Sequence, residues 1–144
     1  MQVLVDTNIW SLALRRHRNR TSEAETERVA MLRSLIQDGR ARLIGPIRQE
    51  LLSGIRESGQ FERLRAQLRA FSDEALSMAD YEKAAHLSNE CRRRGLAGSG
   101  VDFLICAVAM AREWRIFTSD SDFRSYAKVV PLQFHSSSTS DNFD

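Results

Sequence analysis

The sequence predicts an α/β sandwich, in which helices surround a small and mainly parallel β-sheet. Short apolar runs alternate along the chain with longer segments whose apolar residues recur every three or four positions. This alternation is typical of parallel strands that are connected by helices. The 144 residues are enough for one domain with a buried core. We expect that domain to span residues 1–134 and the polar tail at 135–144 to be disordered.

The N-terminal segment is expected to form a strand, a helix, a loop and a second helix. Residues 2–5 are an apolar run that ends at Asp6, and the tripeptide DTN then supplies capping side chains for a helix. A polar and basic loop over 15–22 follows. The next helix is expected over 23–38, where the apolar residues have helical spacing and Gly39 ends the helix.

The middle of the chain is expected to be almost entirely helical after one further strand. That strand lies at 41–45, and a proline in the first helical position opens a helix over 46–55. Another helix is expected over 61–71. Asp80 is expected to cap a helix whose last turn is rich in arginine and which ends before Gly95.

The C-terminal third contains the most apolar segment of the chain. Residues 101–111 are apolar nearly all round, which predicts a central and buried helix. A third strand is expected at 115–120 and a short helix at 121–127. A last strand is expected at 129–134, at an edge of the sheet because it contains a proline.

Composition and motifs narrow the possible functions. No apolar stretch approaches the roughly 18 residues of a membrane helix, and an early aspartate interrupts the run that a signal peptide needs, so we expect a cytoplasmic protein. The cysteines fall in expected helices and the three histidines are scattered, which argues against a zinc site. All but Lys83 and Lys128 of the 21 basic residues are arginines. Arginine suits a phosphate-bearing partner, but it can also reflect genome composition, so a net charge of +2 leaves both readings open.

Five acidic residues fall where strands end or helices begin. Asp6 follows the first strand, and Asp120 and Asp122 follow the third. Glu50 lies about one turn into the helix after the second strand, and Asp102 lies in the first turn of the buried helix. Because the C-terminal ends of parallel strands share one edge of a sheet, these side chains are candidates for a common site there.

Each acid taken alone has a simpler explanation as a helix cap, a turn residue or a solvated helix residue. Ser99 and Asp102, for example, resemble a capping box in which Asp replaces Glu. The five together are harder to explain in this way, because clustered carboxylates repel each other and need a cation or shared protons. Oxygen ligands without His or Cys favour Mg²⁺ or Mn²⁺. Such an ion beside an arginine-rich surface indicates phosphoryl-transfer chemistry of the nuclease type.

Four segments of the sequence together resemble the PIN-domain ribonucleases, and especially the VapC-type toxins of bacterial toxin–antitoxin pairs. The segments are VLVDTNIW, IRQELLSGI, VDFLICAVAMA and IFTSDSDF, in the order and at spacings similar to those of the family. The resemblance extends over residues 2–133 and implies the PIN-like three-layer sandwich. DTN alone would be a weak signal, whereas the four segments together are a strong one.

The resemblance also implies roles for individual residues. An acidic quartet would hold one or two divalent ions, Mg²⁺ or Mn²⁺; its members are Asp6, Glu50, Asp102 and Asp120. Asp122 would be an auxiliary acid near the metal or a helix cap. Asn8 and Thr118 would orient the ligands, and Ser99 resembles the small polar residue that often precedes the third acid of the family.

As an activity, the resemblance implies a metal-dependent endoribonuclease that hydrolyses RNA by metal-activated water and leaves a 5′-phosphate and a 3′-hydroxyl. It further implies a cognate antitoxin that fills the active-site groove, and a homodimer. Two alternatives stay open: an RNA-processing PIN-domain enzyme without an antitoxin, and a catalytically silent RNA-binding module. A response-regulator receiver and a haloacid-dehalogenase-like phosphatase are disfavoured, because the first strand ends in one isolated aspartate rather than in paired acids or D-x-D.

The basic loop after the first expected helix is longer than in many members of the family. We hypothesise that its arginines, Arg15, Arg16, Arg18 and Arg20, form a flexible clamp on RNA phosphates. A loop that is merely solvated is an equally good explanation.

Overall fold

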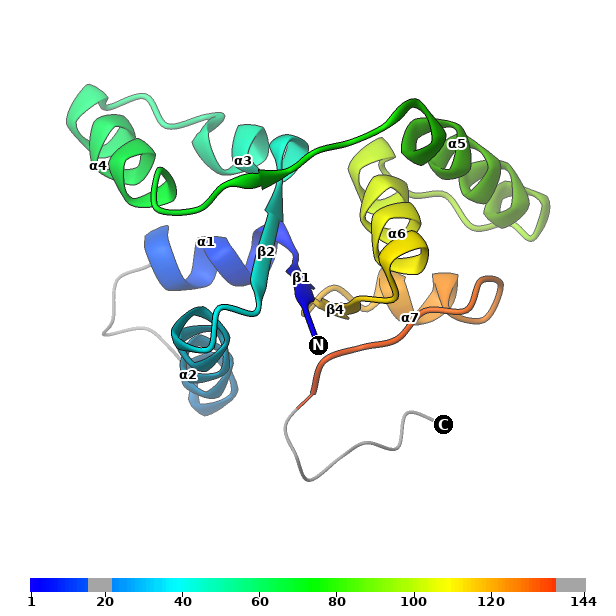
Figure 1. The fold of residues 1–144 in the computed structure, drawn as a ribbon, viewed down its shortest axis with the longest axis horizontal. Coiled ribbons are helices and arrows are strands. Elements are labelled where there is room, and N and C mark those ends of the chain that lie inside the picture. Colours follow the sequence, from blue (N-terminus) through cyan, green and yellow to red (C-terminus); the bar gives the residue numbers. More distant parts are fainter. Residues whose placement is uncertain (16–21, 137–144) are drawn as a thin grey trace.

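The computed structural model describes residues 1–15 and 22–136, and a parallel β-sheet lies at its centre (Figure 1). Within those residues the sheet has four strands in the order β3-β2-β1-β4. The strands are β1 (Val3–Val5), β2 (Ala41–Ile44), β3 (Asp73–Glu74) and β4 (Arg115–Phe117). Every neighbouring pair is parallel. The predicted α/β fold with a small parallel sheet is therefore confirmed.

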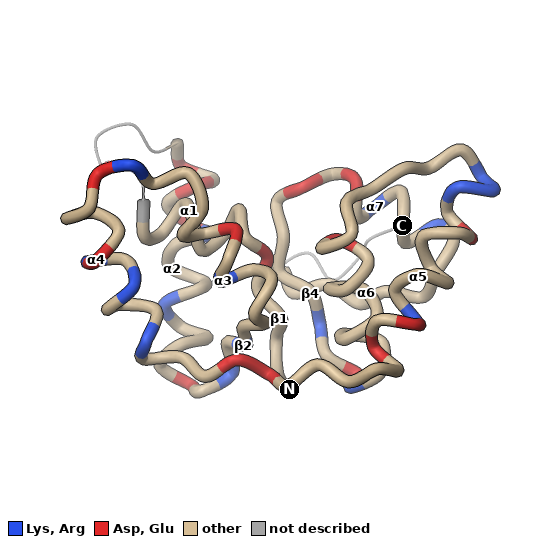
Figure 2. Tube along the Cα trace, turned by 90° about the horizontal axis from the view of Figure 1, so that it is seen from above, with Lys and Arg blue, Asp and Glu red and all other residues tan. Residues whose placement is uncertain are grey.

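Helices form a layer on each side of the sheet. They are α1 (Thr7–Arg15), α2 (Glu23–Gln37), α3 (Gly45–Leu52), α4 (Ser58–Leu68), α5 (Met78–Arg93), α6 (Gly100–Arg112) and α7 (Asp122–Tyr126). Figures 1 and 2 show α1 to α4 on one side of the strands and α5 to α7 on the other. The result is a three-layer sandwich in which β1 is a central strand, paired with β2 and β4.

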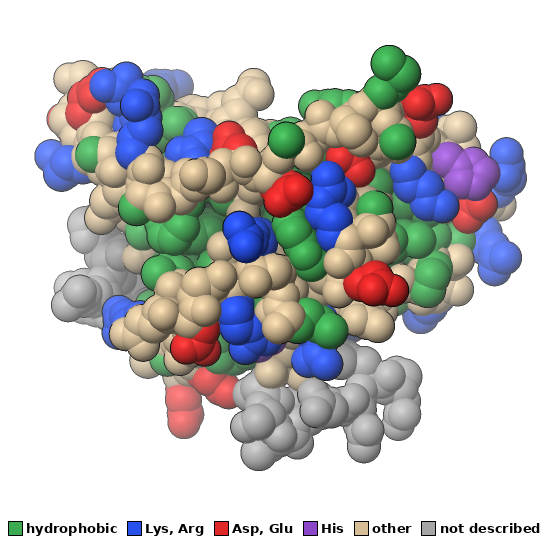
Figure 3. Space-filling view, viewed as in Figure 1, with side chains coloured by type: hydrophobic (Ala, Val, Ile, Leu, Met, Phe, Trp, Pro, Cys, Tyr) green, Lys and Arg blue, Asp and Glu red, His purple; other side chains and the backbone are tan. Residues whose placement is uncertain are grey.

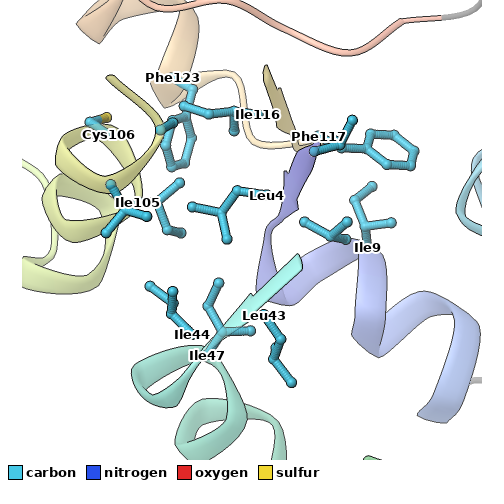
Figure 4. Close-up of a cluster of buried hydrophobic side chains, with 14 of the residues drawn as sticks. Leu4, Ile9, Leu43, Ile44, Ile47, Ile105, Cys106, Ile116, Phe117 and Phe123 are labelled. Atoms are coloured by element: carbon cyan, nitrogen blue, oxygen red, sulfur yellow. The ribbon is translucent and has the colours of Figure 1, made fainter. Parts of the chain in front are cut away.

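The core is continuous through the sheet because the strands near its centre are apolar on both faces. The three residues of β1 are fully buried. Figure 4 shows Leu4 beside Ile105 of α6, while Ile9 and Phe117 lie on the other side of β1. Helix α6 is the most apolar helix, and its burial between the sheet and α5 follows from that composition. The buried residues of β1 hold this strand in the middle of the core, and Asp6, which follows it directly, is therefore held at the end of the strand.

Three expected helix boundaries were wrong, each for a local reason. The helix expected to run to residue 55 ends at Leu52, because Gly54 adopts a left-handed conformation with a φ of +83°. The helix expected over 61–71 is α4, which begins earlier because the Glu57 carboxylate accepts from two backbone N–H groups of its first turn. Asp80 is not the N-cap of α5. Ser77 is the N-cap, and Asp80 is its partner three residues later in a capping box.

The edges of the sheet also differ from the expectation. The two-residue strand β3 was not predicted, since Asp-Glu has no apolar pattern. The last strand, expected at 129–134, is reduced to one isolated parallel bridge between Ile116 and Phe134. Ile116 N donates to Gln133 O and His135 N donates to Ile116 O, so the segment touches β4 at a single point.

Across the described ranges 1–15 and 22–136, no helix has both the length and the apolar character needed to cross a membrane. Of the tail predicted to be disordered, residues 137–144 lie outside the described residues.

Candidate active site

Asp6 lies at the junction between β1 and α1, where the strand ends and the chain turns into the helix. Its backbone N–H donates to Phe117 O of β4 at 2.9 Å, and its carbonyl accepts from the N–H groups of Ile9 and Trp10. Trp10 is fully buried and its indole Nε1 donates to Val5 O at 3.1 Å. These bonds fix the backbone of Asp6 against both neighbouring elements, and its side chain is only 6% exposed.

The Asp6 carboxylate is held by three donors. Oδ1 accepts from the Thr7 N–H at 2.7 Å, and Oδ2 accepts from the Thr118 hydroxyl at 2.7 Å and from the Asn8 amide at 3.2 Å. The Thr118 hydroxyl also accepts from the Asp120 N–H at 3.0 Å. Asn8 and Thr118, predicted as orienting groups, therefore connect Asp6 to the loop that carries Asp120.

Asp102 reaches the same edge of the sheet from the first turn of α6. Ser99 is the N-cap of that helix, and its hydroxyl accepts from the Asp102 N–H at 3.1 Å. The expected capping box is formed only in that direction, because the Asp102 carboxylate accepts from the hydroxyl of Tyr126 at 2.8 Å instead. Tyr126 is 1% exposed, and its ring packs against Phe103 and Phe123. Tyr126 was not predicted as a site residue, because its local sequence does not indicate a hydrogen bond to Asp102, 24 positions earlier.

Gly98 makes room for this tyrosine. A Cβ atom at residue 98 would lie only 2.2 Å from the Tyr126 hydroxyl oxygen and 2.8 Å from its Cζ. Any larger residue at 98 would therefore displace the Tyr126 ring. The close approach of backbone and ring allows the hydroxyl to reach Asp102.

The remaining predicted acids lie further toward the solvent. Glu50 of α3 is exposed, and its Oε1 accepts from the Thr7 hydroxyl at 2.7 Å. Asp120 is half-buried, and its Oδ1 accepts from the Asp122 N–H at 2.9 Å, so it also caps the start of α7. Asp122 is exposed. Figure 2 shows acidic segments on both sides of the strand ends, on α3 and between β4 and α7.

The pKa of Asp6 shows that these acids influence one another. Burial raises this pKa from 3.8 to about 6, against the lowering effect of hydrogen bonds from Thr118 and the Thr7 N–H. The charges of Asp102 and Asp120 contribute to this rise as well. Asp6, the most deeply buried of the five predicted acids, is therefore a carboxylate whose ionisation its acidic neighbours oppose.

The pKa of Asp102 is raised as well, first by burial and then by the charges of Asp120 and Asp122, while Tyr126 and Ser99 lower it. The thiol of Cys106 lies behind the cluster. Burial raises the pKa of Cys106 above its usual range, and the charge of Asp102 adds to the effect. Asp6, Asp102 and Asp120 thus form an electrostatic cluster, which we call the acidic cluster, with Asp122 at its edge.

The donor set of the acidic cluster suits a hard cation, since it consists only of carboxylate oxygens with polar groups around them. Within residues 1–15 and 22–136, however, no three His, Cys, Asp or Glu side chains are arranged so that they could hold an ion. Three of the acids have separate hydrogen-bond partners instead. Thr7 holds Glu50, Tyr126 holds Asp102, and the start of α7 holds Asp120.

The proposed arginine clamp falls largely outside the structure. Arg16, Arg18 and Arg20 lie outside the described residues, and Arg15 is the last residue of α1. Two other arginines, Arg28 of α2 and Arg124 of α7, line a hollow beside Asp120. The sequence pattern did not single them out.

Comparisons with known proteins agree with this architecture. The profile of the PIN domain family matches residues 3–129. A chain of the crystal structure of FitAcB from Neisseria gonorrhoeae is similar, with a TM-score of 0.72 and 22% identity over 93% of this chain and 97% of that one. A chain of VapBC2 from Rickettsia felis, bound to a DNA fragment from their promoter, has a TM-score of 0.70 and 18% identity, covering 94% and 98%. For VapBC-1 from nontypeable Haemophilus influenzae the TM-score is 0.65 and the identity 13%, covering 94% and 97%. A sequence search among curated proteins gave no significant match.

Proposed function

Because the chain belongs to the PIN-domain family, we propose that it is a metal-dependent endoribonuclease and the toxin of a toxin–antitoxin pair. The observation that carries the proposal is the burial of Asp6 beside Asp102 and Asp120. An aspartate that served only to cap α1 would have no reason to lie where burial and two like charges raise its pKa to about 6.

The cofactor of the proposed reaction is Mg²⁺ or Mn²⁺. Asp6, Asp102 and Asp120 are the residues that would hold it, with Glu50 and Asp122 as the outer acids. When bound, such an ion supplies charge neutralisation for the carboxylates and Lewis acidity toward a water and a phosphodiester.

The protein's own contribution is to hold these acids in place. Thr118 and Asn8 fix the Asp6 carboxylate, while Tyr126 fixes that of Asp102. Outer groups of this kind commonly orient metal ligands. Figure 3 shows basic side chains over both helical layers, on the face from which the strands start. Nearer the acidic cluster, Arg28 and Arg124 line the hollow beside Asp120, which suits attraction to an RNA backbone.

The proposed toxin role rests on the solved structures whose fold is similar. The similar solved structures include VapBC pairs and a toxin–antitoxin complex from Klebsiella pneumoniae, the latter with a TM-score of 0.61 and 19% identity. We therefore propose a cognate antitoxin as a partner, a homodimeric toxin and a cytoplasmic location, where both RNA and antitoxin are available. The alternatives are an RNA-processing enzyme without an antitoxin and a silent RNA-binding module.

The test of the activity is cleavage of a labelled single-stranded RNA by the purified chain. We expect cleavage with Mg²⁺ or Mn²⁺, a 5′-phosphate on the product, and no cleavage in EDTA. Asp102→Asn should abolish cleavage, while Asp38→Asn, a change at an exposed C-cap aspartate of α2, should leave it intact. Equal cleavage by Asp102→Asn and the unmodified chain would overturn the assignment of the site. RNA binding without cleavage in any metal would favour the silent module.

The test of the toxin role is separate and uses living cells. Expression of the chain should arrest growth, and co-expression of the neighbouring small reading frame should restore it. Cleavage in vitro without any growth arrest would favour the RNA-processing alternative.

A further inference from the structure

We propose that a hollow beside Asp120 is a subsite for one nucleotide of the RNA, next to the phosphodiester that is cleaved. The inference rests on the proposed function and adds to it a place where a base is recognised. The hollow has a volume of about 250 Å³. Its walls are Arg28 of α2, the loop 118–121 after β4, the start of α7, and the pair Phe134 and His135.

The size of the hollow favours a small and flat occupant. Its 250 Å³ fall just below the roughly 300–1,000 Å³ typical of sites for drug-sized ligands. That volume suits a single nucleotide rather than a helix or a peptide strand. Single-stranded RNA can present one unstacked nucleotide in this way, which is how most sequence-specific RNA recognition works.

The walls carry the three kinds of group that a nucleotide needs. Phe134 and His135 are both half-buried, and each offers an aromatic ring for stacking on a base. The hydroxyls of Ser119 and Ser121 can bond to base edges or to a ribose. Arg28 is half-buried on α2 and can pair with a phosphate through two parallel hydrogen bonds.

His135 gives a further indication of a missing partner. Its Nδ1 is buried and has no hydrogen-bond partner among the described residues. Its ring lies edge-on to Phe117 of β4, with the ring centroids 5.5 Å apart, so the imidazole stands against the end of the sheet. A buried polar atom without a partner is uncommon in folded proteins and is often explained by a ligand or water that completes the site.

The hollow adjoins the acidic cluster directly. Asp120 lines it, and so does Thr118, whose hydroxyl donates to Asp6 at 2.7 Å. Arg28 and Ser119 also line a second hollow of about 400 Å³, which Asn8 shares. A strand that placed one base beside Phe134 could therefore continue past Arg28 into the second hollow, with the intervening phosphate near the acids.

The two kinds of wall predict two kinds of effect. Contacts to phosphate position an RNA without reading its sequence, whereas contacts to base edges set the preference. Arg28 should therefore govern affinity for every nucleotide, while the loop 118–121 and the aromatic pair should govern which base is preferred.

The first experiment measures binding without cleavage. The full chain carrying Asp102→Asn is titrated with each of the four nucleoside 5′-monophosphates and with inorganic phosphate, and amide shifts are followed by NMR. We expect shifts in 118–121 and 134–135, a preference for one base, and weaker binding of inorganic phosphate. Adding Arg28→Ala should weaken binding of all four nucleotides by about five-fold or more. Arg33→Ala, on the exposed part of the same helix, should leave binding unchanged.

Two results would overturn the subsite. Binding of inorganic phosphate as tight as that of the nucleotides would make the hollow a simple anion site. Absence of shifts in 118–121 and 134–135, with all four nucleotides, would remove it altogether. Both results are independent of cleavage, so they can be told apart from a failure of the proposed ribonuclease activity.

The second experiment reads the cleavage sites in a pool of random RNA. Ser121→Ala and Phe134→Leu, the latter keeping an apolar side chain against the core, should change the base preferred beside the cleaved bond. Thermal melting confirms that each variant is folded. Cleavage with an unchanged preference in both variants would contradict base recognition in this hollow, even if the chain is a ribonuclease.

Discussion

Asp6 and Asp80 are buried to the same extent, at 6% and 5% exposure, yet their pKa values are shifted in opposite directions. Burial raises the pKa of Asp6 to about 6, whereas hydrogen bonds from Arg112 lower the pKa of Asp80 to about 2. The two carboxylates differ in their neighbours. One has acidic neighbours and polar supports, and the other has an arginine.

The surroundings of Asp80 are those of a structural ion pair. Arg112 donates to both carboxylate oxygens at 3.0 Å, and the Ser77 N–H donates at 2.8 Å. Arg112 also donates to Glu74 of β3 and to Ala75 O. One guanidinium thus joins α6, the start of α5 and the edge strand, and every part of the arrangement favours ionised Asp80.

The difference teaches that burial alone does not identify a functional acid. Desolvation acts on both residues, but at Asp80 a bidentate arginine more than offsets it. At Asp6, the supports Thr118, Asn8 and the Thr7 N–H hold the carboxylate in position without neutralising it. A buried acid that is oriented but not neutralised is suited to receive a cation.

The largest effect is expected from Asp6→Asn. Cleavage should fall by at least about 100-fold, or about 2.7 kcal/mol in activation free energy, because the proposed metal site loses its most deeply buried oxygen ligand. In EDTA at pH 7 the same variant should unfold at a higher temperature, since a repelled and desolvated charge is removed. The stabilisation should be on the order of 1 kcal/mol, because an amide satisfies the surrounding donors less well. Cleavage kinetics and calorimetry check the two results, and an inactive but destabilised variant would contradict the comparison.

The second effect concerns the other aspartate. Arg112→Met should lower the free energy of unfolding by about 2–3 kcal/mol, because Asp80 is left buried without its partner. Cleavage per folded molecule should be unchanged. Arg33→Met, at an exposed arginine of α2, is the matched control and should have little effect. Combining Arg112→Met with Asp80→Asn should cost less than the two single changes added together, as denaturant unfolding can measure. Additive costs would mean that the two side chains are not coupled.

The third effect is a pair of opposite pH windows for stability in EDTA. The pKa of Asp80 is 3.8 in the unfolded chain and about 2 in the folded protein. The stability that ionised Asp80 adds to the fold is therefore complete above pH 3.8 and is lost as the pH falls toward 2. The pKa of Asp6 rises from 3.8 to about 6, so its cost is absent below pH 3.8 and complete above about pH 6. At about 1.4 kcal/mol per unit of pKa, the window should amount to roughly 2 kcal/mol for Asp80 and roughly 3 kcal/mol for Asp6.

Matched asparagine variants separate the two windows. The stability difference between Asp6→Asn and the unmodified chain should grow from pH 4 to pH 6 and then level off. The difference for Asp80→Asn should instead shrink as the pH falls from 4 to 2. Urea unfolding across this range measures both, and two differences of the same sign and slope would refute the opposite pKa shifts.

Much of the fold and part of the acidic cluster could be predicted from sequence because they depend on local pattern. The apolar run before Asp6 places this residue at the end of a strand, and the apolar helix over 101–111 places Asp102 in a first helical turn. Because the C-terminal ends of parallel strands share one edge of the sheet, both residues could be assigned to that edge. The strand β3 could not be predicted, since two charged residues carry no periodicity. The last expected strand failed because its segment meets β4 only through Phe134.

The distant partners of Asp80, Glu50 and Asp102 could not be read from local pattern, whereas Asn8, Thr118 and Ser99 were expected. Asp80 looked like a cap, and its bond to Arg112 spans 32 residues. Thr7 reaches Glu50 across 43 residues. Such pairs depend on how helices dock, which no spacing in the sequence encodes. The same holds for Tyr126, whose role is the least visible and whose removal should have the smallest effect.

Tyr126→Phe keeps a buried ring but removes the donor to Asp102. The pKa of Asp102 should rise further, because this hydrogen bond lowers it. Cleavage and affinity for Mn²⁺ should each fall by about 10-fold, or about 1.4 kcal/mol, while the melting temperature changes little. Unchanged Mn²⁺ affinity would show that Tyr126 only fills space.

Gly98→Ala should disturb the hydrogen bond between Tyr126 and Asp102 by adding a Cβ atom beside the tyrosine. Its Cβ would lie 2.2 Å from the Tyr126 hydroxyl oxygen, so the ring must move and Asp102 should lose its donor. This variant should show the loss of Mn²⁺ affinity together with a lower melting temperature. Adding Tyr126→Phe to it should recover part of the stability, since the closest clashing atom is gone, but none of the affinity. Recovery of both stability and Mn²⁺ affinity would mean that Asp102 needs only space at residue 126 and no hydrogen-bond donor. Recovery of stability alone would show that the ring of Tyr126 packs the core, while its hydroxyl positions the Asp102 carboxylate.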